Sequence, residues 1–392
     1  MVTRRAFLGS AFGLSAMAFA PGPLLAVQSP TAGMWVDPEL ASYLALTPAS
    51  VVTLDQATPV IYGNAKLQAD TLGFALPFDT ADEAARSAWV NGTYTVALPS
   101  AFRNYGFMDG FSALTGFEIG QVFSGVELGE PPDVITMIRG AFDIDMIRAA
   151  QLAAGYQAID IDGHTVYSLA DDYALSPDNP VQRWALARLN NSALLDDGTL
   201  VYTPARELMR AVLTPEATLD TVPPVRQALG ALDAPLITAM LLGPGAFVPS
   251  LPLEQLLQPQ TEDEIADFIL AMRDRTPAPA VLTGIVGSTA GGPLPSSGEE
   301  ITPVAAGAPK SVTKMSFVYL TPDEATAAAG QIENRLATGN SVAQERPWTD
   351  MFASWSAVQG ADPITVLVTL EWIGVPRSLE LIFNRDIGFI TG

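Results

Sequence analysis

Residues 193–204 read ALLDDGTLVYTP, and this stretch carries the strongest local signal for the fold. Two short apolar runs, Ala193–Leu195 and Thr199–Tyr202, stand on either side of Asp197-Gly198. A type I′ turn needs positive φ at both central residues, so Asp-Gly between apolar runs indicates a β-hairpin. We therefore predict two antiparallel strands joined at Asp197-Gly198.

A second Asp-Gly pair lies upstream. Ile159–Ile161 and Thr165–Leu169 flank Asp162-Gly163, which predicts another hairpin. The preceding Asp160 gives this turn the look of a calcium loop. That loop needs a further acidic residue before the glycine and a Glu six positions after it, and the sequence has neither. Strand and turn is the favoured interpretation.

Capping residues predict where helices begin. Thr261-Glu262-Asp263-Glu264 and Thr321-Pro322-Asp323-Glu324 are capping boxes, in which the Thr oxygen accepts from the third helical amide and the Glu reaches back. Thr203-Pro204 places a cap residue before a proline at the first helical position. Two further helices are expected after the single caps Asp79 and Asp143.

The apolar residues after these caps recur at helical spacing, so each helix has an expected buried face. Three sets are predicted to face the core: Met146, Ile147, Ala150 and Ala154 before a stop at Gly155; Leu208, Met209 and Val212 in Ala205–Leu213; and Ala325, Ala329, Ile332 and Leu336 before a stop at Gly339. Trp348, Phe352 and Trp355 have the same spacing, which favours a short helix there as well.

Short apolar runs between these helices are expected to be strands. They are Leu72–Leu76, Val134–Ile138, Leu236–Leu242, Ala280–Val286, Met315–Leu320, Ile364–Glu371 and Ser378–Phe383. Because the strands come in hairpins and alternate with capped amphipathic helices, the sequence predicts an α+β fold with mostly antiparallel sheets.

The mature chain is expected to consist of two α+β halves, residues 27–230 and 231–392, with a flexible Gly/Pro/Ser-rich loop at 287–311. Val201–Pro204 and Val318–Pro322 both join a strand to a capped helix, which hints that the halves are related.

The N-terminus has the sequence features of an export signal. Thr3, Arg4, Arg5, Phe7 and Leu8 follow the order Thr-Arg-Arg-x-Phe-Leu and closely resemble the twin-arginine motif. The apolar stretch that follows is too short for a comfortable membrane span and fits the h-region of a signal. The resemblance implies recognition by the twin-arginine translocation machinery and export of a folded chain.

We expect cleavage after Ala26, with an uncleaved membrane anchor as the alternative. Ala18-Phe19-Ala20 also has the small-x-small form, but Pro21 would follow that cut. Residues 1–26 are thus predicted to be a signal peptide. The mature protein is expected in the periplasm, at the cell surface or outside the cell, and at the membrane only through an uncleaved signal.

Composition excludes several classes of function. The chain has 20 Lys and Arg against 42 Asp and Glu, and its net charge of −22 disfavours nucleic acid and anionic lipid as partners. The absence of cysteine excludes disulfides, thiolate nucleophiles and Cys-ligated metals. A single histidine excludes a metal centre with several His ligands. We therefore assign no catalytic, cofactor or metal residues.

Two features of the sequence are candidate sites. His164 stands beside a turn, and no Gly-x-Ser-x-Gly nucleophile motif accompanies it, so we interpret it as an exposed flanking residue. Eight aromatic residues crowd positions 89–123: Trp89, Tyr94, Phe102, Tyr105, Phe107, Phe111, Phe117 and Phe123. A packed aromatic core is the favoured interpretation, and an exposed cleft for a ligand or partner is the alternative.

The segment 196–202, read with the capped helix and hairpin before it, faintly resembles exported bacterial proteins of unknown function built from repeated α+β units. Many of those proteins are lipoproteins, whereas this chain lacks the lipobox cysteine. The resemblance implies export and an α+β fold. No catalytic residue is assigned in that group, so none is transferred.

These observations favour an exported, non-enzymatic protein that binds a ligand or a protein partner outside the cytoplasmic membrane. Two alternatives stay open. One is the solute-binding protein of a transporter, which would have two lobes around a cleft. The other is a hydrolase that uses paired carboxylates, which would have two acids about 5–10 Å apart in a pocket.

Overall fold

The computed structural model describes residues 37–51, 60–243, 261, 281–286, 311–341, 343–374, 376–383 and 388–391. Helices and antiparallel strands are both abundant in these residues, which confirms the α+β class. The export signal, its cleavage site, the helix expected after Thr261 and the loop expected up to residue 310 lie outside the described residues.

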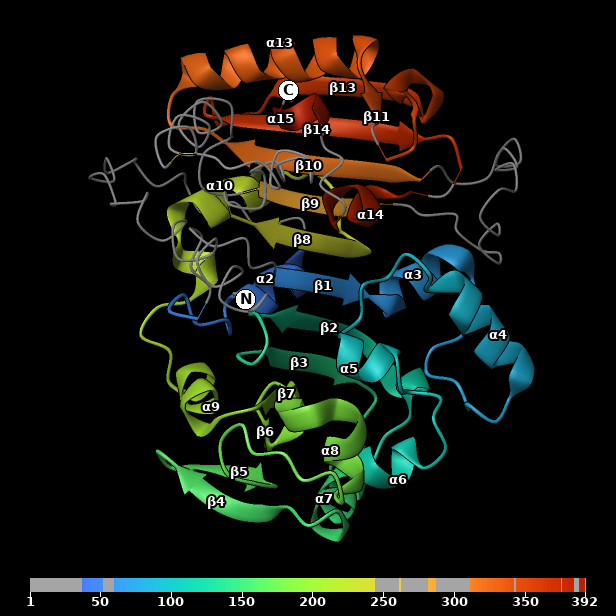
Figure 1. Ribbon diagram of the computed structural model, residues 1–392, viewed down its shortest axis with the longest axis vertical. Coiled ribbons are helices and arrows are strands. Elements are labelled where there is room, and N and C mark those ends of the chain that lie inside the picture. The colour runs from blue at the N-terminus through green and yellow to red at the C-terminus, as the bar shows by residue number, and fades with distance from the viewer. Residues whose placement is uncertain are drawn as a thin grey trace. The chain divides into compact units, whose positions relative to one another are not determined.

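Twelve strands form one sheet in the order β13-β14-β10-β9-β8-β1-β2-β3-β7-β6-β5-β4 (Figure 1), and the described strand pairs are all antiparallel. The strands are β1 (Val60–Asn64), β2 (Val122–Leu128), β3 (Ile135–Gly140), β4 (Gln157–Ile161), β5 (His164–Ser168), β6 (Asn191–Leu194), β7 (Leu200–Thr203), β8 (Thr238–Leu242), β9 (Val281–Val286), β10 (Val312–Val318), β13 (Phe352–Gln359) and β14 (Thr365–Trp372). A separate small ladder pairs β11 (Asn340–Ser341) with β12 (Arg346–Pro347).

The described helices flank these strands along the chain. They are α2 (Pro38–Leu44), α3 (Ala65–Leu72), α4 (Glu83–Gly92), α5 (Ser100–Arg103), α6 (Phe111–Thr115), α7 (Ile144–Ala153), α8 (Pro180–Ala185), α9 (Arg206–Leu213), α10 (Pro223–Gly230), α13 (Pro322–Thr338), α14 (Ser378–Phe383) and α15 (Gly388–Thr391). Short 3₁₀ turns connect several of them.

The strand order repeats. β1-β2-β3 form a meander, α7 follows, and the hairpin β6-β7 returns so that β7 pairs with β3. β8-β9-β10 form a second meander, α13 follows, and the hairpin β13-β14 returns so that β14 pairs with β10. β1 and β8 join the two runs at the centre. The junctions at Val201–Pro204 and Val318–Pro322 follow β7 and β10, which are not equivalent strands.

One element breaks this repeat. The hairpin β4-β5 lies between α7 and β6 in the chain, and its β5 pairs with the outer edge of β6. The strand that occupies the place of β6 in the second run is β13, which ends the sheet. The added hairpin therefore gives the first run a strand junction that the second run lacks.

Successive side chains along each strand point alternately to the two faces of the sheet, and both faces are buried. In β7, Val201 belongs to a core with α2, α9 and α10, whereas Leu200 and Tyr202 belong to a core on the opposite face. We call the side of the sheet that Leu200 and Tyr202 face the α7 face and the other side the α9 face. A third cluster lies under α13 in the C-terminal part of the chain.

The crowded aromatic segment forms the core of the α7 face. Trp89, Phe102, Phe111 and Phe117 are buried, and Phe102 meets Phe111 and Phe117 edge to face. The packed-core interpretation is confirmed for these residues. Phe107 and Tyr94 stay more than one-third exposed, and Phe107 packs against the Trp89 ring at 5.3 Å.

Both predicted hairpins form, but with different turns. Asp162 and Gly163 have φ of 51° and 88°, as a type I′ turn requires. In the second hairpin Gly198 alone has positive φ, and Leu195 N–H donates to the Thr199 carbonyl. A type I′ turn there was therefore the wrong expectation. A longer loop with one left-handed glycine joins the strands, because Asp196 adds a residue to the connection.

Two of the predicted caps are confirmed. Asp143 accepts hydrogen bonds from the amides of Asp145 and Met146 at the start of α7, and Gly155 follows the helix with φ of 99°. The Thr321 capping box starts α13, whose buried residues are the four predicted. The predicted buried face of α7 was partly wrong. Met146 is exposed, and Ile147 and Gln151 are the residues that turn inward.

The predictions for two other helix caps were wrong. Asp79 caps only a turn, and Asp82 accepts the first amides of α4. Thr203 is the last residue of β7, and its hydroxyl donates to the Ala205 carbonyl. Ala205 still has extended backbone angles and is itself the residue before the helix, so α9 begins later than the Thr-Pro pattern predicted.

Three predicted elements have a different structure. Leu72 ends α3, and Gly73 caps that helix in the left-handed region, so Leu72–Leu76 is not a strand. Ser378–Phe383 is a helix. The strand prediction failed because a short apolar run is compatible with either structure. Phe352 and Trp355 lie in β13, after a 3₁₀ turn at Trp348, so the expected helix is absent there.

The Thr321 cap gives a testable expectation for stability. Thr321→Ala should lower the free energy of unfolding by about 1 kcal/mol, because the Glu324 amide loses its acceptor. Thr326→Ala on the same helix is the control, since Thr326 is exposed and alanine is the better helix former. Urea unfolding followed by circular dichroism measures both variants. Equal losses in the two would show that the cap is not the cause.

Candidate functional site

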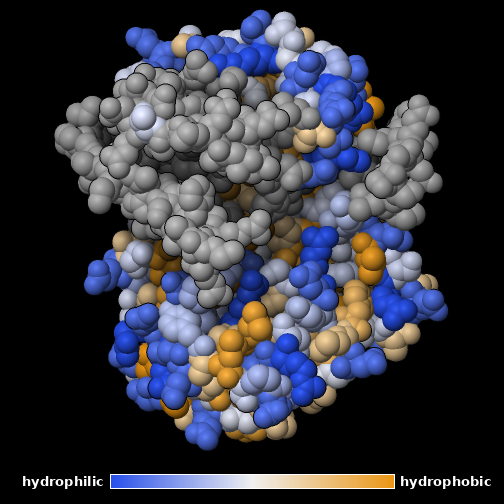
Figure 2. Space-filling view, in the orientation of Figure 1, coloured by the Kyte–Doolittle hydropathy of each residue, from blue (hydrophilic) through white to orange (hydrophobic). Residues whose placement is uncertain are grey.

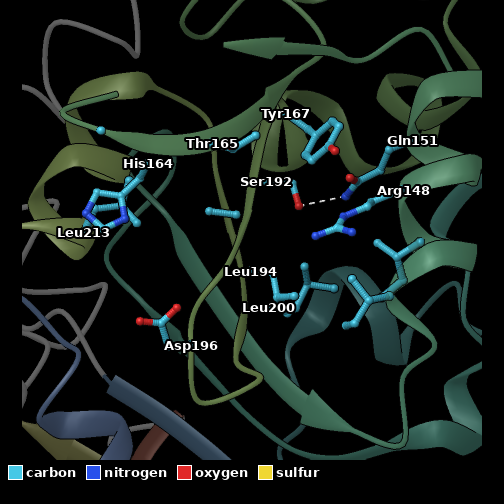
Figure 3. Close-up of a pocket in the computed structure, with 14 residues that line it drawn as sticks. Arg148, Gln151, His164, Thr165, Tyr167, Ser192, Leu194, Asp196, Leu200 and Leu213 are labelled. Carbon is cyan, nitrogen blue, oxygen red and sulfur yellow. Dashed lines mark hydrogen bonds between the residues drawn. The ribbon is translucent and has the colours of Figure 1, made fainter. Parts of the chain in front are cut away.

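A pocket of about 370 Å³ opens where β5 and β6 separate (Figure 3). Its walls come from α7, the first half of β5, β6 with the turn after it, Leu200 of β7 and Leu213 at the end of α9. All of these elements lie in the first run of strands and in the added hairpin.

The pocket follows from incomplete strand pairing. β5 pairs with β4 along its whole length, from His164 to Ser168. It pairs with β6 only through Tyr167↔Ser192 and Ser168↔Asn191. Beyond these two pairs β6 continues along β7 while the start of β5 stays with β4. The sheet is therefore split at one end of the β5–β6 junction.

The split is lined from both faces of the sheet. Val166 belongs to the core on the α9 face, so its neighbours Thr165 and Tyr167 point toward α7. His164 points to the α9 face, where Leu213 also lines the pocket. The opening thus passes between two strands and reaches side chains on each side of the sheet.

A buried polar network forms the wall on the α7 face. Gln151 Nε2 donates a hydrogen bond of 2.8 Å to Ser192 Oγ, and both side chains are almost fully buried. Burial raises the pKa of the neighbouring Tyr202 well above its ordinary value, against the effect of hydrogen bonds with Ser192 and Gln151. This wall stays neutral at physiological pH and presents fixed hydrogen-bonding atoms.

The charged groups of the pocket lie nearer to solvent. Arg148 extends from α7 toward the pocket, and its side chain is 53% exposed, with Asp145 at 3.5 Å (Figure 3). His164 and Asp196 are exposed. The prediction that His164 is an exposed residue beside a turn is confirmed, although its place on the pocket wall was not expected.

Ser192, His164 and Asp196 are the residue types of a catalytic triad, and all three line the pocket. They are not arranged as one. Ser192 points to the α7 face and bonds to Gln151, whereas His164 points to the α9 face. Figure 3 shows the His164 ring and the Ser192 hydroxyl well apart. The geometry does not let His164 take a proton from Ser192.

The lining contains one carboxylate, that of Asp196. A carboxylate-pair hydrolase needs a second acid facing the first, and this pocket does not provide one. Among the described residues there is also no group of three or more His, Asp or Glu side chains placed to hold a metal ion. The pocket offers apolar walls with a guanidinium, an imidazole and several hydrogen-bonding groups.

Reasoning from the sequence missed Arg148, Gln151 and Ser192. One local signal was present: Gln151 stands four residues after Ile147, on the face of α7 that turns inward. A glutamine at a buried helical position needs a hydrogen-bonding partner, which indicates a buried polar site. That the partner is Ser192, on a strand 41 residues away, is not visible locally.

The export-signal residues Thr3, Arg4, Arg5, Phe7 and Leu8, and the cleavage site after Ala26, are outside the described part of the chain. Within the described part, the structure contains no helix with the length and apolar character needed to cross a membrane.

Comparison with known proteins finds no significant match to a family model, to a curated protein or to a solved structure.

Proposed function

We propose that the protein is an exported, non-enzymatic binding protein that holds a ligand or a segment of a partner in the pocket between β5 and β6. The observation that carries the proposal is the split in the sheet, which leaves about 370 Å³ between apolar and polar walls. Ligand sites typically have volumes of roughly 300–1,000 Å³ and combine apolar walls with a few directed polar groups. This pocket falls at the small end of that range.

The wall chemistry supports binding rather than turnover. Ile147, Ala193 and Leu200 provide buried apolar surface, while Gln151 donates a hydrogen bond to Ser192 that fixes both side chains. The hydrogen-bonding partner of Ser192 is the Gln151 amide and not a base, so Ser192 is not activated as a nucleophile. Rigid polar groups of this kind orient a bound molecule.

Export is the second part of the proposal. It rests on the order Thr-Arg-Arg-x-Phe-Leu at Thr3–Leu8 and on the absence of cysteine, which suits a chain that folds before it crosses the membrane. The periplasm, the cell surface and the medium all remain compatible with this route.

The binding proposal accounts for the fold better than the two alternatives do. A transporter's solute-binding protein would have two lobes around a cleft, whereas the described strands form one continuous antiparallel sheet. A carboxylate-pair hydrolase would need a second acid beside Asp196.

Filling the pocket tests the proposal. Thr165→Trp should block the α7 side of the split, and it should fold because position 165 is exposed and tryptophan is favourable in strands. Gln157→Trp on β4 is the matched control, since residue 157 is exposed on a strand but does not line the pocket. The probes are hexanoate, phenylacetate, phenethylamine and acetylated dipeptide amides.

We expect at least one probe to raise the thermal unfolding midpoint of the native protein and of Gln157→Trp, but not of Thr165→Trp. Ligand binding to the folded state alone stabilises it by about 2.7 kcal/mol at a hundred times Kd, which is readily measured. If no probe shifts the midpoint, or if Thr165→Trp responds like the native protein, the pocket is not a binding site.

A further inference from the structure

We propose that the ligand of this pocket is an extended peptide segment that enters the split as an added strand between β5 and β6, with an acidic side chain directed at Arg148. The inference rests on the proposed binding function and specifies its ligand class. Three independent features support it: the direction of the main-chain groups at the split, the alternation of the walls, and the position of the one arginine.

The register of the β4-β5 hairpin directs the main-chain N–H and C=O of Thr165 toward the split. Ile161 and His164 flank the two-residue turn, so they form a hydrogen-bonded pair. Main-chain direction alternates along an antiparallel strand, and Thr165 N–H and C=O therefore point away from β4. Two residues later, Tyr167 has the same direction and meets Ser192. Thr165 meets no strand on that side in the described part of the sheet.

The register of the β6-β7 hairpin directs the main-chain N–H and C=O of Leu194 toward the same split. Leu195 N–H donates to the Thr199 carbonyl at 2.9 Å, so the main-chain groups of Leu195 point toward β7. By alternation, the N–H and C=O of Leu194 point away from β7, as those of Ser192 do where it pairs with Tyr167. Thr165 and Leu194 thus direct their main-chain groups into the split from opposite sides.

Strand groups of this kind bind extended peptides. A peptide strand placed between β5 and β6 would complete the ladders that end at Tyr167↔Ser192, with Thr165 on one side and Leu194 on the other. Only one residue on each side is open before the hairpin turns begin. The segment within the split is therefore short, in agreement with the small volume of the pocket.

The walls define a pattern for the side chains of this segment. Cross-strand neighbours point to the same face, so the peptide residue opposite Thr165 would point to the α7 face. Arg148 extends toward the pocket from that side, which favours Glu or Asp at this position. The residues before and after it would point to the α9 face, where Leu213 and Ala193 favour an aliphatic side chain.

The net negative charge of the protein opposes binding of an acidic peptide. A measured preference for an acidic central residue would therefore indicate a local positive charge at the pocket. The chain carries a net charge of −22 and repels acidic peptides in general. A preference for an acidic central residue therefore needs a local cation, and Arg148 is the arginine that lines the pocket on the α7 face. Its present partner Asp145 is almost fully exposed and lies 3.5 Å away, so that ion pair is weak and easily exchanged.

The test uses fluorescence anisotropy with the full protein and a fluorescein-labelled pentapeptide, acetyl-Thr-Val-Glu-Val-Thr-amide. Two altered peptides carry lysine, or N-methylated glutamate, at the centre. Three protein variants are compared with the native chain: Arg148→Met, Thr165→Trp and the control Gln157→Trp. Circular dichroism verifies that each variant is folded.

We expect the native protein and Gln157→Trp to bind the glutamate peptide equally. N-methylation should weaken binding at least about fivefold, because it removes a main-chain donor. Arg148→Met should weaken binding of the glutamate peptide about fivefold to tenfold and abolish the preference over lysine. Thr165→Trp should abolish binding, which separates insertion at the split from pairing at an outer edge of the sheet.

Each failure has a separate meaning. If the small amphipathic probes bind at the pocket but no pentapeptide does, the peptide inference is overturned and the binding function stands. Peptide binding that tolerates N-methylation, or that survives Thr165→Trp, also overturns strand insertion at this site. If neither peptides nor small probes bind, the proposed function falls as well.

Discussion

Phe102→Ala is expected to lower the free energy of unfolding by about 4 kcal/mol. Phe102 is completely buried, and its ring lies 5.6 Å from that of Phe117 and 5.5 Å from that of Tyr202. Alanine would leave a cavity among rings that belong to different elements and that cannot all collapse into it. Because Tyr202 borders Ser192 and Gln151, the loss would also loosen the polar wall of the pocket.

Phe107→Ala is the matched control for this change. Phe107 comes from the same aromatic segment but is 37% exposed and has one ring partner, Trp89. Its replacement should cost about 1 kcal/mol, because much of its surface already meets water. Urea unfolding followed by tryptophan fluorescence compares the two variants. Equal costs would contradict the assignment of Phe102 to the centre of this core.

Arg139→Met is expected to cost about 3 kcal/mol. The Arg139 guanidinium donates to Asp197 at 2.7 Å and to Thr199 Oγ1 at 2.7 Å, lies 3.4 Å from Glu39 and stacks over the ring of Tyr43. It therefore ties β3 to α2 and to the turn after β6. Methionine keeps an apolar stem of similar length but leaves both carboxylates without their cation. Those carboxylates retain some contact with water, which limits the cost.

Arg86→Met provides the comparison, since Arg86 is exposed on α4. That variant should differ from the native protein by less than about 0.5 kcal/mol. Urea denaturation at neutral pH measures both. A loss in Arg139→Met no larger than that in Arg86→Met would show that the cluster around Arg139 contributes nothing to stability.

The same cluster predicts a change in acid stability. Burial raises the pKa of Asp197, but hydrogen bonds with Thr199 and the Arg139 charge outweigh this effect and hold that pKa below its ordinary value of 3.8. A lowered carboxyl pKa stabilises the fold above the unfolded pKa, and the contribution is lost as pH falls through the folded pKa. Between neutral pH and about pH 3, the Arg139→Met variant should therefore lose less stability than the native protein. A parallel fall in both would contradict this role.

Features encoded in a few consecutive residues were predicted well. The Thr321 capping box and the four residues that α13 buries match the structure, because cap, stop and apolar stripe all lie within one helix. The hairpin at Asp162-Gly163 is equally local, since positive φ at two neighbouring residues is enough to define its turn. Short apolar runs such as Ser378–Phe383 were ambiguous between strand and helix, and this one is a helix.

Aromatic crowding at 89–123 indicated a core before its partners were known. The number of aromatic residues in so short a segment was sufficient for that inference. Which rings would be central was not predictable, because Phe102 meets Tyr202 a hundred residues later in the chain. Phe107, from the same segment, stays on the surface.

By itself the sequence determined the α+β class, both Asp-Gly hairpins, the starts of α7 and α13, and the exclusion of thiol chemistry, because each depends on composition or on neighbouring residues. Only the tertiary structure decided that β5 and β6 pair at two positions and then separate, that Arg148 and Leu213 meet the resulting split from opposite faces, and that Arg139 gathers two distant carboxylates. Pairing between separate hairpins depends on how α7 and α9 pack against the two faces of the sheet. No local pattern encodes that packing, and the candidate site arises from it.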